Sequence, residues 1–170
     1  KILSYLNKFN IKVLFFCVGD NIRKYPELVS DILSEGHSIG NHTFYHKNIR
    51  KLSYKEIAKE IEMTNNVLFD KFGYKPEYFR PPYGRFKISL QKLTENYKMK
   101  SVMWSLLTYD YKNDFEVVKF AVLKYLKNNS IVVLHDSIKS SQIILDSIDF
   151  IMDVANKNNY EIGNPAECLK

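Results

Sequence analysis

The sequence predicts an α/β fold, because short apolar runs alternate along it with segments that carry apolar residues at helical spacing. Residues 13–18 and 131–134 are continuous apolar runs, which are typical of strands covered on both faces. The length of 170 residues, with 45% hydrophobic and 14% aromatic content, indicates one globular domain spanning residues 1–170. Strands joined by helices pair in parallel through right-handed crossovers. The candidates are therefore an α/β barrel and an open, doubly wound sheet.

In the first half of the chain, helix-terminating residues divide the apolar pattern into elements. Pro26 suits the first turn of a helix, and Gly36 suits a left-handed cap at its end. The segment Ser53–Glu56 is a capping box that opens a long helix, and Gly73 closes it. The elements predicted here are helix 2–10, strand 13–18, helix 26–36, strand 37–41, helix 53–73 and strand 78–80.

In the second half, the corner Pro81–Gly84 forbids further helix or interior strand, because proline fixes the backbone and lacks a donor. Asn113 or Asp114 caps a helix with apolar residues at positions 117–125. The elements predicted here are a helix around 90–93, strand 100–104, that capped helix, strand 131–134, helix 144–155 and strand 160–162. The chain is thus expected to contain six strands.

The charge of the chain gives little indication of nucleic-acid binding. The net charge is +6 and the pI is near 9.1, but the lysines are spread along the chain and no nucleic-acid recognition motif is present. We interpret the densest basic cluster as a solvated surface. The alternative is that it binds an anionic polymer or an envelope surface. Its members are Lys47, Arg50, Lys51, Lys55 and Lys59.

The termini and cysteines add few constraints. No apolar run is long enough for a transmembrane span, and no signal peptide is recognisable. Cys17 and Cys168 cannot form a disulfide framework. Because the chain opens on Lys1 inside a helix-like pattern, we expect a natural N-terminal piece to precede it.

Two histidines follow the second predicted strand at a spacing of four residues. His42 and His46 would point the same way on a helical turn, and two neutral imidazoles suit zinc, cobalt or nickel. A third ligand from elsewhere would leave a position for water. Chance alone produces such a pair about once in fifteen tries among four histidines, so the pair needs support from other residues.

That support comes from polar residues at the ends of other predicted strands. Arg80 follows the third strand, Asp110 the fourth, and His135 ends the fifth. The carboxyl ends of parallel strands meet at one edge of the sheet, where sites form in barrels and open sheets alike. His42, His46 and these three residues are therefore expected at the same edge.

Each candidate site residue can be interpreted as having either a structural role or a catalytic or binding role. His135 is either a buried core histidine or a general acid, and contact with Asp110 would stabilise its protonated form. Arg80 either forms a structural ion pair or fixes a carboxylate in orientation. The backbone N–H of Tyr83 could stabilise an oxyanion. Several other side chains form either core or a shelf for a sugar face, namely Trp104, Tyr109, Tyr111, Tyr45 and Val133, while His37 reads as structural.

Four segments in this order resemble successive motifs of the polysaccharide deacetylases, which are carbohydrate esterase family four or NodB-homology domains. They are His42–His46, Arg80–Gly84, Trp104–Tyr111 and Val133–Asp136. The stretch from Phe15 to His42 is also similar, so the resemblance covers nearly the whole chain. It implies a distorted (β/α)7 barrel and hydrolysis of N-acetyl groups from N-acetylglucosamine units, with a divalent metal held by an aspartate and two histidines.

The resemblance also implies a role for each matching residue. His42 and His46 become metal ligands, His135 the general acid and Asp110 the residue that tunes it. Arg80 orients the catalytic base, and Tyr83 supplies the oxyanion N–H. Tyr111 and Val133 stand where the family usually has tryptophan and leucine, so the groove for the acetyl methyl group is expected to differ.

The largest departure from the family lies at the start. The family opens with a strand ending in Thr-Phe-Asp-Asp-Gly, whose aspartates are the base and the third metal ligand, and this chain begins downstream of it. Six strands and that one make seven, which favours an N-terminally incomplete domain. Asp20 is a poor substitute for the aspartates.

The function implied is a zinc-dependent N-deacetylase, with cobalt or nickel possible, acting on a peptidoglycan or chitin-like polysaccharide. One alternative is an inactive carbohydrate-binding domain of the same fold. Another is an unrelated metal hydrolase on an open α/β sheet. The resemblance also favours an envelope or extracellular location, whereas the oligomeric state is left open.

Overall fold

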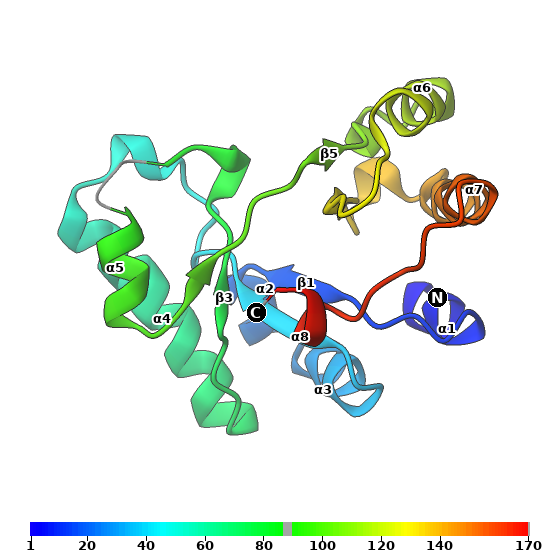
Figure 1. Cartoon of the computed structure of the whole chain (residues 1–170). Coiled ribbons are helices and arrows are strands. Elements are labelled where there is room, and N and C mark those ends of the chain that lie inside the picture. Colours follow the sequence, from blue (N-terminus) through cyan, green and yellow to red (C-terminus); the bar gives the residue numbers. More distant parts are fainter. Residues whose placement is uncertain (87–89, 170) are drawn as a thin grey trace. The chain divides into compact units, whose positions relative to one another are not determined.

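The computed structural model describes residues 1–86 and 90–169, and these form two compact units. Unit 1 contains Lys1–Ile11 and Met103–Gly163, and unit 2 contains Lys12–Val102 and the end of the chain from Asn164. Figure 1 labels the elements of both units. Strands and helices alternate along the chain, as predicted for an α/β fold.

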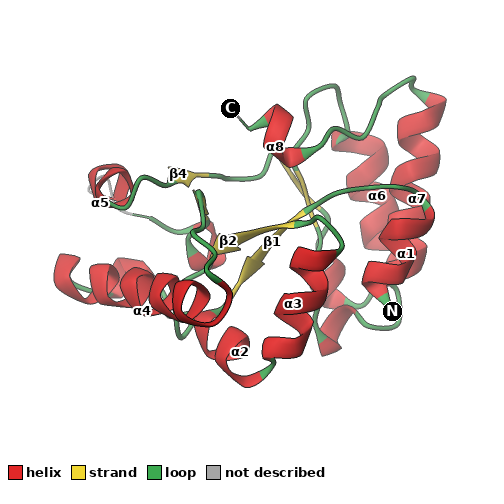
Figure 2. Cartoon of the chain, turned by 90° about the horizontal axis from the view of Figure 1, so that it is seen from below, coloured by secondary structure: helices red, strands yellow, loops and turns green. Residues whose placement is uncertain are grey.

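Unit 2 is built on a parallel sheet with the order β1-β2-β3-β4. The register pairs Cys17 with Asn41, Asn41 with Phe79, and Phe79 with Ser101, so the carboxyl ends of the strands meet at one edge. Helices α2, α3 and α4 lie on the same side of the β1–β2 pair (Figure 2). The strands are β1 (Leu14–Cys17), β2 (Ser38–Asn41), β3 (Tyr78–Phe79) and β4 (Lys100–Ser101). The helices are α2 (Gly19–Lys24), α3 (Pro26–Ser34), α4 (Tyr54–Phe72), α5 (Leu90–Asn96) and α8 (Pro165–Cys168), with 3₁₀ turns η1 (Ile49–Lys51) and η2 (Pro82–Gly84).

The long helix α4 begins and ends where the sequence predicts. The Ser53 side chain accepts from the Glu56 backbone N–H, and the Glu56 carboxylate accepts from the Ser53 backbone N–H, so the capping box is complete. Gly73 ends the helix in the left-handed conformation, with φ of 63°. The buried face of α4 contributes to a core cluster with η1, β3 and α5, formed by Ile49, Ile57, Ile61, Phe79, Leu90, Leu93 and Met99.

Unit 1 contains a second parallel pair of strands covered by two helices. Strands β5 (Leu106–Leu107) and β6 (Val132–Val133) pair in parallel. Helices α6 (Phe115–Tyr125) and α7 (Ile144–Lys157) pack together through Val118, Val122, Ile151 and Val154. Helix α1 (Ile2–Lys8) and the 3₁₀ turns η3 (Asp110–Lys112) and η4 (Ile138–Ser140) complete this unit.

Several predicted boundaries were wrong, although the chain does contain six strands across its described residues. The segment 160–162 is not a strand. Its backbone has no ladder partner within the described residues, and the Tyr160 N–H instead caps α7 by donating to the Ala155 carbonyl at 2.9 Å. The predicted strand 100–104 ends at Ser101, and a separate strand, β5, follows at Leu106–Leu107. The short helix α2 and the 3₁₀ turn at Pro82–Gly84 were not predicted.

The alternation expected for a barrel is therefore confirmed, whereas closure into seven strands stays a prediction. None of the described helices combines the length and apolar character needed to cross a bilayer.

Candidate active site

The two histidines after β2 lie close together, but not on a helical turn as predicted. His42 continues β2, because its N–H donates to the Cys17 carbonyl at 3.1 Å. The residues after it form an irregular loop in which Thr43 and His46 adopt positive φ, at 63° and 54°. The ring centroids of His42 and His46 are 4.9 Å apart. Two left-handed residues thus bring the rings together where the prediction expected a helix.

Asn41, the last residue of β2, holds the start of this loop. Its side chain is fully buried; the amide nitrogen donates to the Ile61 carbonyl at 2.9 Å and to the Asn65 side chain at 2.8 Å. Its side-chain oxygen accepts from the Thr43 N–H at 2.8 Å. The His46 N–H in turn donates to the Thr43 hydroxyl at 3.1 Å. The sheet and α4 therefore fix the conformation of the loop on which both histidines lie.

Glu60 of α4 is a second anchor, and sequence reasoning missed it. Its carboxylate is buried, and Oε2 accepts from the Phe44 N–H at 3.0 Å and the Tyr45 N–H at 2.7 Å. Oε1 lies 3.3 Å from the Lys47 ammonium. A signal was available, because Glu60 falls at helical spacing among the buried residues of α4, where an acidic side chain needs a partner.

Residues after β3 complete this group. The Arg80 N–H donates to the Asn41 carbonyl at 3.0 Å, and the Arg80 carbonyl lies 2.6 Å from His42 Nδ1. The Arg80 guanidinium lies 4.1 Å from the Phe16 ring centroid, and Nε donates to the Val102 carbonyl at 3.0 Å. Burial lowers the pKa of Arg80 to about 10, which leaves it charged at neutral pH.

Tyr83 lies at the corner that the prolines predict. It adopts a positive φ of 59°, and its ring centroid lies 4.8 Å from that of His46. The side chain is 61% exposed, so the ring is not part of the core. His42, His46, Arg80 and Tyr83 are thereby brought together at the carboxyl edge of the sheet in unit 2.

The two imidazoles fit two positions of a metal site. A carbonyl oxygen only accepts, so His42 Nδ1 carries the proton towards Arg80 and Nε2 carries the lone pair. Metal-binding histidines commonly donate their second nitrogen to a carbonyl in this way. No group of three His, Cys, Asp or Glu side chains within residues 1–86 and 90–169 could hold an ion.

Asp20 is engaged elsewhere. Its carboxylate lies 2.8 Å from Arg23 and 2.5 Å from Lys24, and these hydrogen bonds, the one to Lys24 first, lower the pKa of Asp20. That Asp20 does not replace the family's aspartates stays a prediction.

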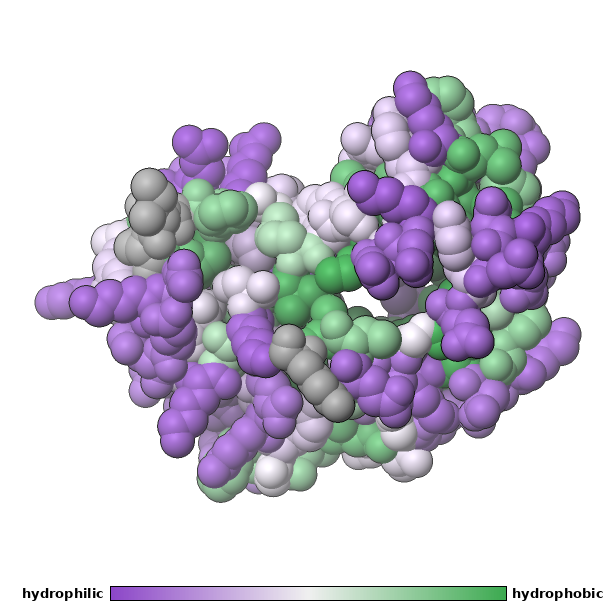
Figure 3. Space-filling view, in the orientation of Figure 1, coloured by the Kyte–Doolittle hydropathy of each residue, from purple (hydrophilic) through white to green (hydrophobic). Residues whose placement is uncertain are grey.

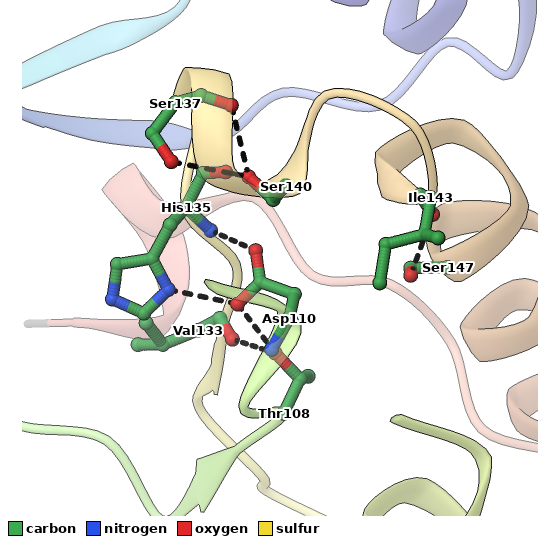
Figure 4. A network of polar contacts seen from close by, with 8 residues as sticks. All are labelled: Thr108, Asp110, Val133, His135, Ser137, Ser140, Ile143 and Ser147. Carbon is green, nitrogen blue, oxygen red and sulfur yellow. Dashed lines mark hydrogen bonds and ion pairs between the residues drawn. The ribbon is translucent and has the colours of Figure 1, made fainter. Parts of the chain in front are cut away.

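Asp110 and His135 form the second group, which belongs to unit 1 (Figure 4). Asp110 is fully buried; Oδ2 accepts from the His135 backbone N–H at 2.6 Å, and Oδ1 lies 2.8 Å from His135 Nδ1. Because a carboxylate only accepts, His135 Nδ1 carries a proton and donates it to Asp110. Nε2 is the ring nitrogen that Asp110 does not contact. The His135 side chain is 40% exposed, which excludes the reading as a core histidine.

Neighbouring hydroxyls support this pair. The Thr108 hydroxyl lies 3.0 Å from Asp110 Oδ1 and 2.8 Å from the Val133 carbonyl, and its single proton serves one of them at a time. The Ser140 hydroxyl donates to the His135 carbonyl (Figure 4). The carboxylate, both ends of the His135 backbone and the imidazole are therefore held together.

The aromatic residues expected to form a sugar shelf divide into different environments. The Tyr111 ring meets the His135 ring edge-on at 5.1 Å, and Val133 is 6% exposed. Trp104 and Tyr109 line a cavity of about 540 Å³ beside α6 that does not include His135 among its lining residues. Tyr45 is 52% exposed and lies beside Lys47, in unit 2.

His37 has the structural role that was predicted. It is 4% exposed, Nδ1 accepts from the Val13 N–H at 3.2 Å, and burial lowers its pKa. It therefore remains neutral inside the fold.

Comparison with known proteins identifies the family of the chain. The sequence profile of the family described as polysaccharide deacetylase matches residues 1–102. The chain belongs to the polysaccharide deacetylase family. A peptidoglycan-N-acetylglucosamine deacetylase from Bacillus cereus is 39% identical over 112 residues, which cover 66% of this chain and 41% of that protein. The chain spans about a third to a half of the length of the first curated relatives that it matches.

Solved structures of this deacetylase family have the same α/β fold. A peptidoglycan N-acetylglucosamine deacetylase in complex with an N-oxidanyl-benzamide is 30% identical, with a TM-score of 0.90, covering 97% of this chain and 78% of that one. A carbohydrate esterase family four pseudoenzyme from Bacillus anthracis is 26% identical, also with a TM-score of 0.90, covering 99% of this chain and 59% of that one. The family therefore includes active and inactive members of this fold.

Proposed function

We propose that this chain forms part of a metal-dependent hydrolase that removes N-acetyl groups from N-acetylglucosamine-containing polysaccharide, of peptidoglycan or chitin type. The observation that carries the proposal is the buried Asp110 carboxylate, which holds the partly exposed His135 through both its backbone and its ring. A fixed imidazole with one nitrogen towards a carboxylate and the other available for proton transfer suits a general acid.

His42 and His46 are proposed as two of the ligands of a divalent cation, with Zn²⁺ as first choice and Co²⁺ or Ni²⁺ as alternatives. When bound, such an ion supplies Lewis acidity towards the acetyl carbonyl and activates water. The remaining ligand and the base are assigned by the family resemblance to an aspartate pair. These 170 residues contain no Asp-Asp dipeptide.

The chain's own residues account for the later steps of amide hydrolysis. After water has added to the acetyl carbonyl, the C–N bond breaks and the sugar nitrogen must gain a proton, which His135 donates from Nε2 while Asp110 holds Nδ1. The backbone N–H of Tyr83 is proposed to stabilise the oxyanion, and Arg80 to orient the base. Trp104, Tyr111, Val133 and Tyr45 are proposed as contacts for the sugar and its acetyl group.

The substrate class suggests where the protein acts. A polysaccharide of the envelope would place it in the envelope or outside the cell. The relatives named peptidoglycan deacetylases support this proposal. We interpret residues 1–170 as belonging to one NodB-homology domain.

A catalytically inactive carbohydrate-binding domain is the second candidate. The similarity to the B. anthracis pseudoenzyme supports this candidate. If residues precede Lys1 in the natural protein, an Asp-Asp pair among them favours the enzyme, and the lack of such a pair favours the binder.

Deacetylase assays with the full-length protein test the proposal. Peptidoglycan fragments and chitin oligomers are incubated with the metal-free protein and after addition of Zn²⁺, Co²⁺ or Ni²⁺, and released acetate is measured. We expect activity that depends on the metal and that His46→Ala removes together with zinc affinity. Binding of the glycan without any acetate release would favour the inactive binder.

A further inference from the structure

The net charge of the chain is concentrated beside the histidine loop. Five basic residues and one acidic residue lie between positions 47 and 59, so this stretch carries +4 of the chain's net charge of +6. The other 157 residues together carry only +2. A surface with this concentration of one sign creates a local potential that attracts the opposite charge.

Four of these cations are exposed and have no acidic partner within the part of the chain that the structure describes. Lys47 pairs with Glu60, but Arg50, Lys51, Lys55 and Lys59 form no ion pair with an acidic side chain among residues 1–86 and 90–169. All four are exposed. We call these four residues the cationic face. The exposed Glu56 within it is occupied by the capping box, where it accepts from Ser53.

The cationic face is adjacent in sequence to the residues that anchor the histidine loop. His46 is followed directly by Lys47, and Tyr45 and Lys47 both contact the Glu60 carboxylate, at 2.7 Å and 3.3 Å. Lys59 precedes Glu60, and Lys55 lies four residues earlier, about 6 Å along the helix on the same face. Hydrophilic side chains project over the region of α4 in Figure 3. Arg50 and Lys51 therefore lie in the turn η1 that follows the loop with the proposed metal ligands, and Lys55 and Lys59 lie on the helix α4 that anchors this loop.

We propose that the cationic face binds the carboxylates of an anionic glycan, so that the substrate is peptidoglycan with acidic peptide stems and not a neutral chitin-like polymer. This inference rests on the proposed function, because it names the substrate class of the same site. Peptide stems carry free carboxylates along the glycan strand, whereas chitin carries none. Lysine and arginine side chains on a solvated surface recognise such a ligand by long-range attraction, with little requirement for fixed geometry.

The experiment compares two charge-matched variants of the full-length protein. Lys51→Gln/Lys55→Gln/Lys59→Gln removes three charges from the cationic face, and Lys92→Gln/Lys127→Gln/Lys157→Gln removes three from exposed positions elsewhere. Lys47 is left intact because it contacts Glu60. Binding and deacetylation are measured on three glycans: peptidoglycan stripped of phosphodiester polymers, the same material with its carboxylates amidated, and chitin oligomers.

The face variant is expected to bind the stripped peptidoglycan about tenfold more weakly at 0.1 M salt, and about as well as wild type at 1 M, where screening extends only about 3 Å. Its affinity for amidated peptidoglycan and for chitin stays unchanged, and the control variant keeps wild-type behaviour. Equal loss in both variants, or equal binding of native and amidated peptidoglycan by the wild type, would overturn the proposal. Binding that disappears when the phosphodiester polymers are stripped would overturn it too, in favour of those polymers.

The outcome separates the two proposals. Charge-dependent binding without acetate release from any glycan contradicts the proposed deacetylase activity and supports the proposed binding role of the cationic face. Acetate release with identical KM for the two variants on stripped peptidoglycan supports the deacetylase and contradicts the cationic face.

Discussion

The histidine loop of unit 2 and the Asp110–His135 pair of unit 1 hold imidazoles in different ways. In the loop, the side chains of Asn41 and Glu60 bind backbone N–H groups and so fix the backbone. The positions of the two rings then depend on the positive φ angles of Thr43 and His46. In the pair, a single buried carboxylate holds both the backbone and the ring of one histidine. The first arrangement distributes its support over the sheet and α4, whereas the second concentrates it in one side chain.

This difference predicts different consequences of mutation. Loss of one anchor of the loop should cost stability and loosen both rings, because buried N–H groups lose their acceptor. Loss of Asp110 should affect the orientation and protonation of one imidazole directly. The two regions can therefore be separated by measuring stability, metal affinity and activity on the same set of variants.

The largest effect is expected for His135→Ala. If His135 protonates the departing amine, its removal should lower kcat by about 10²–10⁴. Zinc affinity should remain near wild type, whereas the midpoint of urea unfolding should fall, because the buried Asp110 carboxylate loses the His135 ring N–H as a partner. Steady-state kinetics and zinc titration measure this. Unchanged kcat would remove His135 from the mechanism.

The next effect is expected for Glu60→Ala. The substitution leaves the Phe44 and Tyr45 N–H groups without their acceptor, the first of them in a buried position, which should cost about 2–4 kcal/mol of unfolding free energy. Glu60→Gln keeps an accepting oxygen and should cost about half as much. Zinc affinity and hydrogen exchange at the two amides report whether the loop has loosened.

Glu62→Ala is the matched control on the same helix, because Glu62 is exposed. It should change stability by less than about 0.5 kcal/mol. Equal effects of the two alanine variants would contradict the anchoring role of Glu60.

The sequence predicted the order of elements well where local chemistry decides them. The capping box, Gly73 and the apolar runs each act over a few residues, and α4, β1 and β2 formed where these signals lie. The strand boundaries within 100–107 and the strand at 160–162 were predicted wrongly. Whether so short a segment forms a strand depends on a partner elsewhere in the chain, which no local pattern reveals.

The same distinction holds for the candidate residues. His42 and His46 were recognisable from their spacing, but the conformation that joins their rings depends on Thr43 and on the distant Glu60. The contact between Asp110 and His135 joins residues that are 25 positions apart, so the sequence could only suggest it through strand ends. Tertiary hydrogen bonds thus determine the geometry of both sites, which the periodicity of the sequence could not predict.

A smaller effect is expected for Gly40→Ala, which tests the sheet beneath the histidine loop. A Cβ at this position would lie 2.5 Å from Phe16 Cε1 and 3.2 Å from the Tyr78 carbonyl. Displacing the Phe16 ring also disturbs the platform under the Arg80 guanidinium. We expect a loss of about 1–3 kcal/mol in urea unfolding, together with reduced activity.

Gly73→Ala is the control for backbone effects alone, because nothing lies within 4 Å of its Cβ position but φ is 63°. It should cost about 1 kcal/mol and leave activity intact. Loss of activity in both variants would mean that global stability, and not the platform, limits the reaction.

The smallest effect concerns His37, which lies before β2 and whose pKa is lowered by burial. The unfolded chain takes up a proton at His37 near pH 6.5, and the folded chain does so only at lower pH, so the unfolding free energy falls as pH drops below about 6.5. His37→Asn keeps an oxygen that can accept from the Val13 N–H but cannot titrate. Urea unfolding between pH 5 and 8 should therefore show a shallower loss of stability in acid for the variant, by up to about 1 kcal/mol per pH unit. Parallel curves for the two proteins would mean that His37 takes up its proton equally well in the folded and unfolded chain, and that acid sensitivity comes from other groups.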